Sequence, residues 1–284
     1  MKLCRFHQNG LGSQEPRVGL YDGTAIRDVT SVAAQLPPLR WPLPPGDQLL
    51  HHLPALRARL EQAAREADVT PLTEVHLLSP VANPHKVICA VGNYPEHVQA
   101  SGKQPRQHGL FFKAGALVGP ANGVALSYPE RPTVHETELA VVIGKAGFRI
   151  SRENALSHVA GYAIALDMTL NALGGGHGPE APSYTKSPDT YGVLGPWLVT
   201  ADEIGDPQTL QIRMEVGGEL RQDANTSRMV LDVAGLIAFA SEIMMLHPGD
   251  IIMTGNPPGA KRVVAGDVMK AWISGIGEMA VAVR

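Results

Sequence analysis

Residues 134–144, VHETELAVVIG, place two glutamates at the mouth of an apolar run. The β-branched and apolar residues from Leu139 to Ile143 predict a buried strand. Because residues two apart in a strand point to the same face, Glu136 and Glu138 should converge. Two close anions repel each other unless a cation lies between them, and a hard divalent ion is the natural partner. Taken alone, however, the segment fits an exposed strand end with solvated glutamates better.

A third carboxylate, Asp167, favours the metal interpretation. It interrupts the apolar run from Ala160 to Met168, which otherwise predicts a buried strand. Burying an unpaired charge is costly, so this carboxylate needs a partner. Backbone amides at a strand end would satisfy it, and so would a metal shared with Glu136 and Glu138.

Length and composition limit the class of protein. The chain has 284 residues, of which 44% are hydrophobic and 18% charged, with a net charge of -3. It is long enough to bury a substantial core, and its composition excludes the disordered and fibrous classes. The interspersed charges form no basic stripe for a phosphate backbone, so nucleic acid is not an expected partner.

The cysteines and the start of the chain bear on location. Cys89 lies in an apolar run, where a reduced and buried thiol is expected, and this favours a cytoplasmic setting. Residues 1–6 carry charges where a signal peptide needs an apolar stretch, and no segment is long and apolar enough to span a bilayer. We therefore expect a soluble protein that does not bind membranes.

The pattern along the chain predicts a strand-rich α+β architecture. We take residues 1–78 as a small N-terminal domain and residues 79–284 as a larger domain. Five prolines between Leu36 and Gly46 predict an extended connector. The elements that the periodicity and capping signals predict are a helix from about Pro54 to Ala67, a short helix to His158 capped by Ser151, a hairpin of Gln211 to Val216 and Glu219 to Gln222, and a helix from about Val233 to Met245 capped by Asp232.

From about Lys86 to its end, the chain resembles the fumarylacetoacetate hydrolase family, with a weaker echo in residues 1–6. The motifs follow one another in family order: GNYPEH at 92–97, LFFK at 110–113, ETELA at 136–140, LDMT at 166–169, Lys186, LGPW at 194–197, GELRQ at 218–222, PGDII at 248–252 and TGNP at 254–257. No single motif is specific, but eight or more in order are hard to obtain by chance. The resemblance implies a mixed β-roll or β-sandwich catalytic domain behind the small N-terminal domain.

The resemblance also implies a metal site. Glu136, Glu138 and Asp167 would be the ligands, with Mg²⁺ expected and Mn²⁺ an alternative, and with waters or substrate completing an octahedron. Lys186 would offset the excess negative charge and donate to a developing oxyanion. Without the family match, a solvated loop lysine is the simpler interpretation of Lys186.

Four further residues match family positions around the substrate. His97 would be the general base, because an imidazole titrates near working pH. Thr254 would bind the substrate carboxylate, and Asn93 and Tyr94 would line the entrance. The alternatives are a surface histidine without a proton role and ordinary turn chemistry for the other three.

The sequence departs from many relatives near these positions. Ala100 stands where they carry a glutamate that pairs with the loop histidine, and Glu96 or Glu180 would have to replace it. Asn171, Ala172 and Gly174 stand where they carry an arginine, an aspartate and a glutamine. The glycine-rich residues 174–179, with His177, could form a remodelled lid.

The resemblance implies an enzyme that acts on a small keto acid in aromatic breakdown. The leading hypothesis is metal-dependent hydrolysis of a carbon–carbon bond in an acylpyruvate-like 2,4-diketo acid through a stabilised enolate. The alternative is a decarboxylase or keto–enol isomerase acting on oxaloacetate or a related dicarboxylic acid, which needs no activated water. A non-catalytic keto-acid binding protein is an alternative of another class. Family members commonly pair, so we expect a homodimer.

Overall fold

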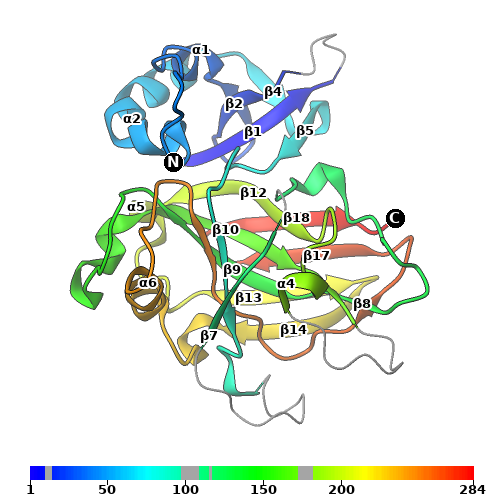
Figure 1. Cartoon of the computed structure of the whole chain (residues 1–284). Helices are drawn as coiled ribbons and strands as arrows, with labels where there is room; N and C mark the ends of the chain where they lie inside the picture. The colour runs from blue at the N-terminus through cyan, green and yellow to red at the C-terminus, as the bar shows by residue number, and fades with distance from the viewer. Residues whose placement is uncertain (10–14, 97–108, 115–116, 172–181) are drawn as a thin grey trace.

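The computed structural model describes residues 1–9, 15–96, 109–114, 117–171 and 182–284. Its N-terminal part combines strands with two helices, drawn in blue and cyan in Figure 1. The elements of this part are β1 (Lys2–Gln8), β2 (Arg17–Tyr21), β3 (Ala25–Asp28), α1 (Thr30–Ala33), α2 (Gln48–Glu66), β4 (Val69–Pro71), the 3-10 turn η1 (Leu72–Glu74) and β5 (Val75–Leu78).

The larger part of the chain is dominated by strands (Figure 1). The strands are β6 (Val87–Val91), β7 (Gly109–Phe112), β8 (Thr133–Val134), β9 (Thr137–Ile143), β10 (Val159–Asp167), β11 (Thr169–Leu170), β12 (Gly192–Thr200), β13 (Gln211–Val216), β14 (Glu219–Asn225), β15 (Ile251–Met253), β16 (Arg262–Val263), β17 (Val268–Ile273) and β18 (Gly277–Ala282). The helical segments are η2 (Pro120–Asn122), η3 (Arg152–His158), α4 (Pro182–Thr185), α5 (Ala201–Ile204), η4 (Thr226–Arg228) and α6 (Val233–Ser241).

The described strands form three sheets. The largest has 11 strands in the order β4-β3-β2-β1-β12-β10-β9-β15-β6-β7, with β5 also paired to β1. The smaller sheets have the orders β11-β8-β16 and β14-β13-β17-β18. Since β15 and β6 are parallel whereas β9 and β10 are antiparallel, the large sheet is mixed. The predicted strand-rich α+β class is confirmed.

The large sheet runs without a break from the N-terminal part into the rest of the chain. Strand β1 pairs with β12, so that Lys2 lies opposite Val199 and Leu3 opposite Leu198. One cluster of buried side chains also joins the two parts, and it includes Leu3 and Leu53 together with Val142. The proposed division after residue 78 therefore falls within a shared sheet and a shared core.

Helix α2 begins at Gln48, and the predicted start at Pro54 is wrong. The side chain of Asp47 accepts a hydrogen bond from the Leu50 amide at 3.1 Å and caps the helix there. Proline inside a helix costs about 3 kcal/mol or more. Burial of Leu50 and Leu53 in the first two turns recovers about 1.5–3 kcal/mol for each side chain, which offsets that cost.

Two other helix predictions need correction. Residues Arg152–His158 form a 3-10 helix in which only Ala155 is buried, and Ser151 makes no side-chain capping bond to it. Helix α6 has the predicted Asp232 cap, whose side chain accepts from the Gly235 amide at 2.8 Å. It ends at Ser241 rather than Met245, and the hydroxyl of that buried serine accepts from the Ile150 amide at 2.9 Å.

Two expectations from the sequence concern the state of the cysteines and the presence of membrane-spanning helices. Cys4 and Cys89 are both free and buried, as expected for Cys89. Within the described ranges, the structure contains no helix that is long and apolar enough to cross a membrane.

Candidate metal centre

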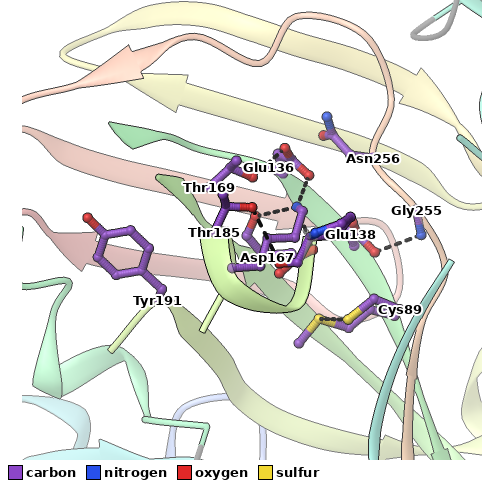
Figure 2. A network of polar contacts seen from close by, with 12 residues as sticks. Cys89, Glu136, Glu138, Asp167, Thr169, Thr185, Tyr191, Gly255 and Asn256 are labelled. Carbon is purple, nitrogen blue, oxygen red and sulfur yellow. Dashed lines mark hydrogen bonds and ion pairs between the residues drawn. The ribbon is translucent and has the colours of Figure 1, made fainter. Parts of the chain in front are cut away.

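Three carboxylates meet because of the register between β9 and β10. Residue Ala165 lies opposite Glu138, and Leu166 lies opposite Thr137. This places Asp167, the last residue of β10, beside Glu136, and its amide donates to the Glu136 carbonyl at 2.9 Å. The oxygens of Glu136, Glu138 and Asp167 then lie within 4.8 Å of one another, and Figure 2 shows the three side chains directed toward a common point. The convergence expected from the sequence is therefore observed.

The cluster is enclosed by protein. Glu138 is 2% exposed and Asp167 1% exposed, whereas Glu136 lies nearer the surface. These exposed fractions contradict the alternative of solvated glutamates at a strand end, because the Glu138 side chain is almost completely shielded from water. The alternative of a turn carboxylate held by backbone amides is also contradicted, because the Asp167 carboxylate forms ion pairs with two lysines.

Lys186 lies among the carboxylates. It follows α4, and its Nζ donates to Glu136 Oε2 at 2.6 Å and to Asp167 Oδ2 at 2.7 Å. Its side chain is 11% exposed, so the alternative of a solvated loop lysine is wrong. The ammonium partly neutralises the negative charge of the cluster.

Lys113, which follows β7, is a second lysine of the site and was not among the predicted functional residues. Its Nζ lies 2.8 Å from Asp167 Oδ1, and it donates to the carbonyls of Lys186 and Tyr191. Its side chain is 2% exposed. The only sequence signal was its place at the end of the LFFK motif, because a lysine after an apolar strand usually marks a surface turn.

The surroundings push the pKa values of the carboxyl groups in opposite directions. Burial raises the pKa of Glu138 well above its usual range, and the negative charge of Asp167 adds to the effect. Burial alone would raise the pKa of Asp167 too, but the ammonium groups of Lys186 and Lys113 outweigh it and hold that pKa below its ordinary value. Despite burial, Asp167 and Glu136 raise the pKa of Lys186, which therefore remains charged.

Neighbouring donors fix the orientation of the two glutamates. The Thr169 hydroxyl donates to Glu136 Oε1 at 2.8 Å. The backbone amide of Gly255 donates to Glu138 Oε2 at 2.6 Å, as the dashed line in Figure 2 shows. Such partners set the direction in which a carboxylate presents its remaining lone pairs to a metal.

The residues expected to bind substrate lie on segments beside this cluster. Asn93 is buried, and both hydrogens of its side-chain amide go to backbone carbonyls, those of Leu231 and Thr254. The hydroxyl of Thr254 is buried and donates to the Leu139 carbonyl at 3.0 Å. Tyr94 is also buried, and its hydroxyl has no hydrogen-bond partner among the described residues.

Of the remaining predicted positions, only Glu96 belongs to the described residues. His97, the expected general base, lies outside the described residues, as do Ala100, His177 and Glu180. Glu96 is described, and it forms an ion pair with Arg228. The roles expected of these residues stay predictions.

The donor set fits a hard divalent cation. Carboxylate oxygens are the ligands that Mg²⁺ and Mn²⁺ prefer. Two positively charged side chains, Lys113 and Lys186, lie beside these carboxylates. In the part of the chain that the structure describes, this is the only group of three or more potential metal ligands.

Comparison with known proteins identifies the family. A family model described as fumarylacetoacetate (FAA) hydrolase C-terminal matches residues 86–284. The chain is 46% identical to a maleylpyruvate hydrolase of Aquipseudomonas alcaligenes over all of this chain and 99% of that protein. It is 35% identical to a mitochondrial oxaloacetate tautomerase of Xenopus laevis over 98% of this chain and 88% of that protein.

A solved structure is also similar over the full length. The crystal structure of maleylpyruvate hydrolase from Sphingobium sp. SYK-6, in complex with manganese(II) ion and pyruvate, superposes with a TM-score of 0.83 at 39% identity. The alignment covers 100% of this chain and 98% of that chain. The buried carboxylate cluster, the matched family model and the full-length relatives agree, and the chain belongs to the fumarylacetoacetate hydrolase family.

Proposed function

We propose that this chain is a metal-dependent hydrolase that cleaves a carbon–carbon bond in a small acylpyruvate-like 2,4-diketo acid. The observation that carries the proposal is the buried cluster of Glu136, Glu138 and Asp167, with Lys186 paired to Glu136 and Asp167. The full-length similarity to a maleylpyruvate hydrolase supports the choice of reaction and makes maleylpyruvate the first substrate to test.

Glu136, Glu138 and Asp167 would hold a divalent ion, either Mg²⁺ or Mn²⁺. Manganese is supported by the Sphingobium maleylpyruvate hydrolase, whose crystal structure contains manganese(II) and pyruvate. When bound, such an ion supplies Lewis-acid stabilisation of the negative charge that develops on the keto oxygens of the substrate.

The protein groups have separate tasks in the proposed reaction. Water adds to the distal acyl carbon, the bond from that carbon to the methylene carbon breaks, and its electron pair becomes the enolate of pyruvate, which then takes up a proton. The charged Lys186 ammonium lies at the carboxylates that would hold the ion. It would therefore donate a hydrogen bond to the enolate oxygen of a substrate bound to that ion. Lys113 holds Asp167 from the other side and keeps its carboxylate ionised.

Proton transfer and substrate contacts complete the proposal. His97 would take the proton from the attacking water, as the family resemblance implies. The Tyr94 hydroxyl would contact the substrate, and the Thr254 hydroxyl would do so after releasing its bond to the Leu139 carbonyl. Among the described residues the buried Tyr94 hydroxyl has no hydrogen-bond partner, and this supports the role, because a ligand would satisfy a group that is costly to bury unpaired.

A second candidate function is keto–enol isomerisation or decarboxylation of oxaloacetate. The similarity to an oxaloacetate tautomerase over 98% of this chain favours it, as does Ala100, since enolate formation needs no activated water. A keto-acid binding protein without turnover is the third outcome that an assay must separate.

Product analysis tests these candidates. The chain would be incubated with Mn²⁺ and separately with maleylpyruvate, acetylpyruvate and oxaloacetate, and the products followed by proton NMR. Pyruvate with maleate or acetate is the expected result. Faster interconversion of oxaloacetate tautomers or loss of carbon dioxide, without cleavage of either acylpyruvate, would replace the proposal with the second candidate. Metal-dependent binding without any product would replace it with the third.

Two further expectations belong to the same proposal. We expect the enzyme to act as a homodimer and to work in the cytoplasm on a soluble keto acid. The pyruvate in the Sphingobium structure supports a keto acid as the small-molecule partner.

A further inference from the structure

We propose that Asn93 and Gln222 clamp the loop 254–257 from its two sides, hold the Gly255 amide on Glu138, and thereby set the affinity of the site for its divalent ion. This inference rests on the proposed metal site. It makes both residues positioning residues, and it gives Asn93 this role in place of the substrate contact that the family resemblance implied.

The loop matters because it supplies a donor to the most buried glutamate. It leaves β15 after Met253, and the Gly255 amide then donates to Glu138 Oε2 at 2.6 Å (Figure 2). A hydrogen bond from a backbone amide to a carboxyl oxygen weakens steeply when its distance or angle departs from the favoured geometry. A shift of the loop would remove this donor and let the Glu138 side chain turn away from Glu136 and Asp167.

Asn93 fixes the first side of the loop. Its Nδ2 donates to the Thr254 carbonyl at 2.8 Å and to the Leu231 carbonyl at 2.9 Å, while its Oδ1 accepts from the Leu231 amide at 2.8 Å. Gly255 has φ +99, and a Cβ on it would lie 2.7 Å from the Asn93 Cβ. Only glycine permits so close an approach in this conformation.

Gln222 fixes the second side. Its Nε2 donates to Asn256 Oδ1 at 2.5 Å and to the Pro257 carbonyl at 2.9 Å. Its Oε1 accepts from the amide of Thr137, the residue between the two glutamates, at 3.2 Å. Gln222 is 1% exposed. One carboxamide therefore connects β14, the loop and the ligand-bearing end of β9.

Both side chains are fully committed to these contacts. A carboxamide has two N–H hydrogens, and in Asn93 and in Gln222 each hydrogen has its own acceptor in the protein. Neither group has a donor left for substrate, so their influence on chemistry passes through the loop and Glu138. Partners of this kind around metal ligands typically change metal affinity by about 10–100-fold when they are removed.

Isothermal titration of Mn²⁺ into the full chain tests the clamp without turnover. The variants are Asn93→Ala and Gln222→Met, the latter similar in length but unable to donate. Asn225→Ala is the matched control, because this carboxamide also bonds to backbone, at Thr209 and Ser227, but away from the cluster. Each clamp variant should bind Mn²⁺ at least about tenfold more weakly than wild type, and the control should bind normally.

A spectroscopic measurement on the metal-free chain separates positioning from general destabilisation. In protein labelled with ¹⁵N-glycine, the Gly255 amide proton should resonate far downfield in wild type and in Asn225→Ala, and lose that shift in both clamp variants. Lower thermal stability with unchanged Mn²⁺ affinity and an unchanged Gly255 resonance would overturn the proposal. Because the resonance is read without metal or substrate, it tests the clamp even if the proposed hydrolysis is not found.

Discussion

The carboxyl group of Glu138 is enclosed and lies beside two other carboxylates, so burial and the charge of Asp167 raise its pKa above the ordinary 4.5. An acid with a raised native pKa adds stability below 4.5 that is lost as the pH rises through the native value. A metal must displace this proton. We therefore predict that Mn²⁺ binding releases a proton and tightens with rising pH, as measured by calorimetry in buffers of different ionisation enthalpy. A binding enthalpy independent of the buffer would contradict this prediction.

Lys113 provides a second prediction at the residue scale. The change Lys113→Met leaves Asp167 Oδ1 buried beside an apolar side chain while Lys186 still pairs with Oδ2, and losing one hydrogen bond to a charged group typically costs about 1.5–3 kcal/mol. The metal-free variant should unfold at a clearly lower denaturant concentration. Lys145→Met, at an exposed lysine, is the matched control and should change the free energy of unfolding by less than about 0.5 kcal/mol. Equal stability of the two variants would contradict the structural role of Lys113.

At this scale, the sequence was sufficient to predict the functional residues whose positions follow from strand geometry. Glu136 and Glu138 were expected on one face because of the two-residue period, although Glu136 lies just before β9, and Asp167 needed a partner because its run was apolar. Lys113 could not be assigned in the same way, since its ion pair with Asp167 depends on how β7 and α4 pack across the site. Tertiary contacts of this kind leave no local periodicity.

Helix α2 shows how a capping residue sets the boundary of an element. Asp47 accepts from the Leu50 amide with Oδ1 and from the Ala82 amide, at 3.2 Å, with Oδ2. The change Asp47→Ala should therefore lower the free energy of unfolding by about 1–2 kcal/mol while leaving Mn²⁺ affinity unchanged. Chemical denaturation measures the effect, with the exposed Asp68→Ala as control. A loss of metal affinity in Asp47→Ala would show that this helix end is coupled to the site.

The same helix shows why element boundaries were harder to predict than elements. Its apolar spacing was clear after Pro54, and proline commonly stands in the first turn of a helix, so the predicted start fell there. The true start depends on Asp47 and on a core surface that covers Leu50 and Leu53. For α6, the capping signal at Asp232 was sufficient to predict the start of the helix. Its end at Ser241 coincides with a hydrogen bond from the Ile150 amide, which belongs to a distant segment.

At the scale of the molecule, the N-terminal part and the rest share one sheet and one core. Removing residues 1–78 would expose the edge of β12 and the side chains packed around Leu198. We predict that a fragment of residues 79–284 fails to fold, giving a non-cooperative thermal transition by circular dichroism and loss of Mn²⁺ binding. A fragment that melts cooperatively and binds Mn²⁺ like the full chain would instead support two independent domains.

The strand pairing behind this prediction could not be obtained from the sequence. Apolar runs predicted β9 and β10, and a period-two pattern predicted β13, but neither kind of pattern states which strands become neighbours. The pairing of β1 with β12 joins residues almost 200 positions apart. Family resemblance predicted the fold class and the metal site, because both depend on motifs that remain recognisable in order along the chain.

The measurement that tests the central claim most directly is the rate of pyruvate formation from maleylpyruvate as a function of Mn²⁺ concentration, for wild type, Glu138→Gln and the exposed control Glu215→Gln. Loss of a ligand should exceed the effect of losing a neighbouring partner, which is about 10–100-fold in affinity or activity. We predict Mn²⁺-dependent pyruvate release in wild type and Glu215→Gln, and a loss of at least about 100-fold in Glu138→Gln. Pyruvate release that persists without divalent metal, or that survives in Glu138→Gln, would contradict the account.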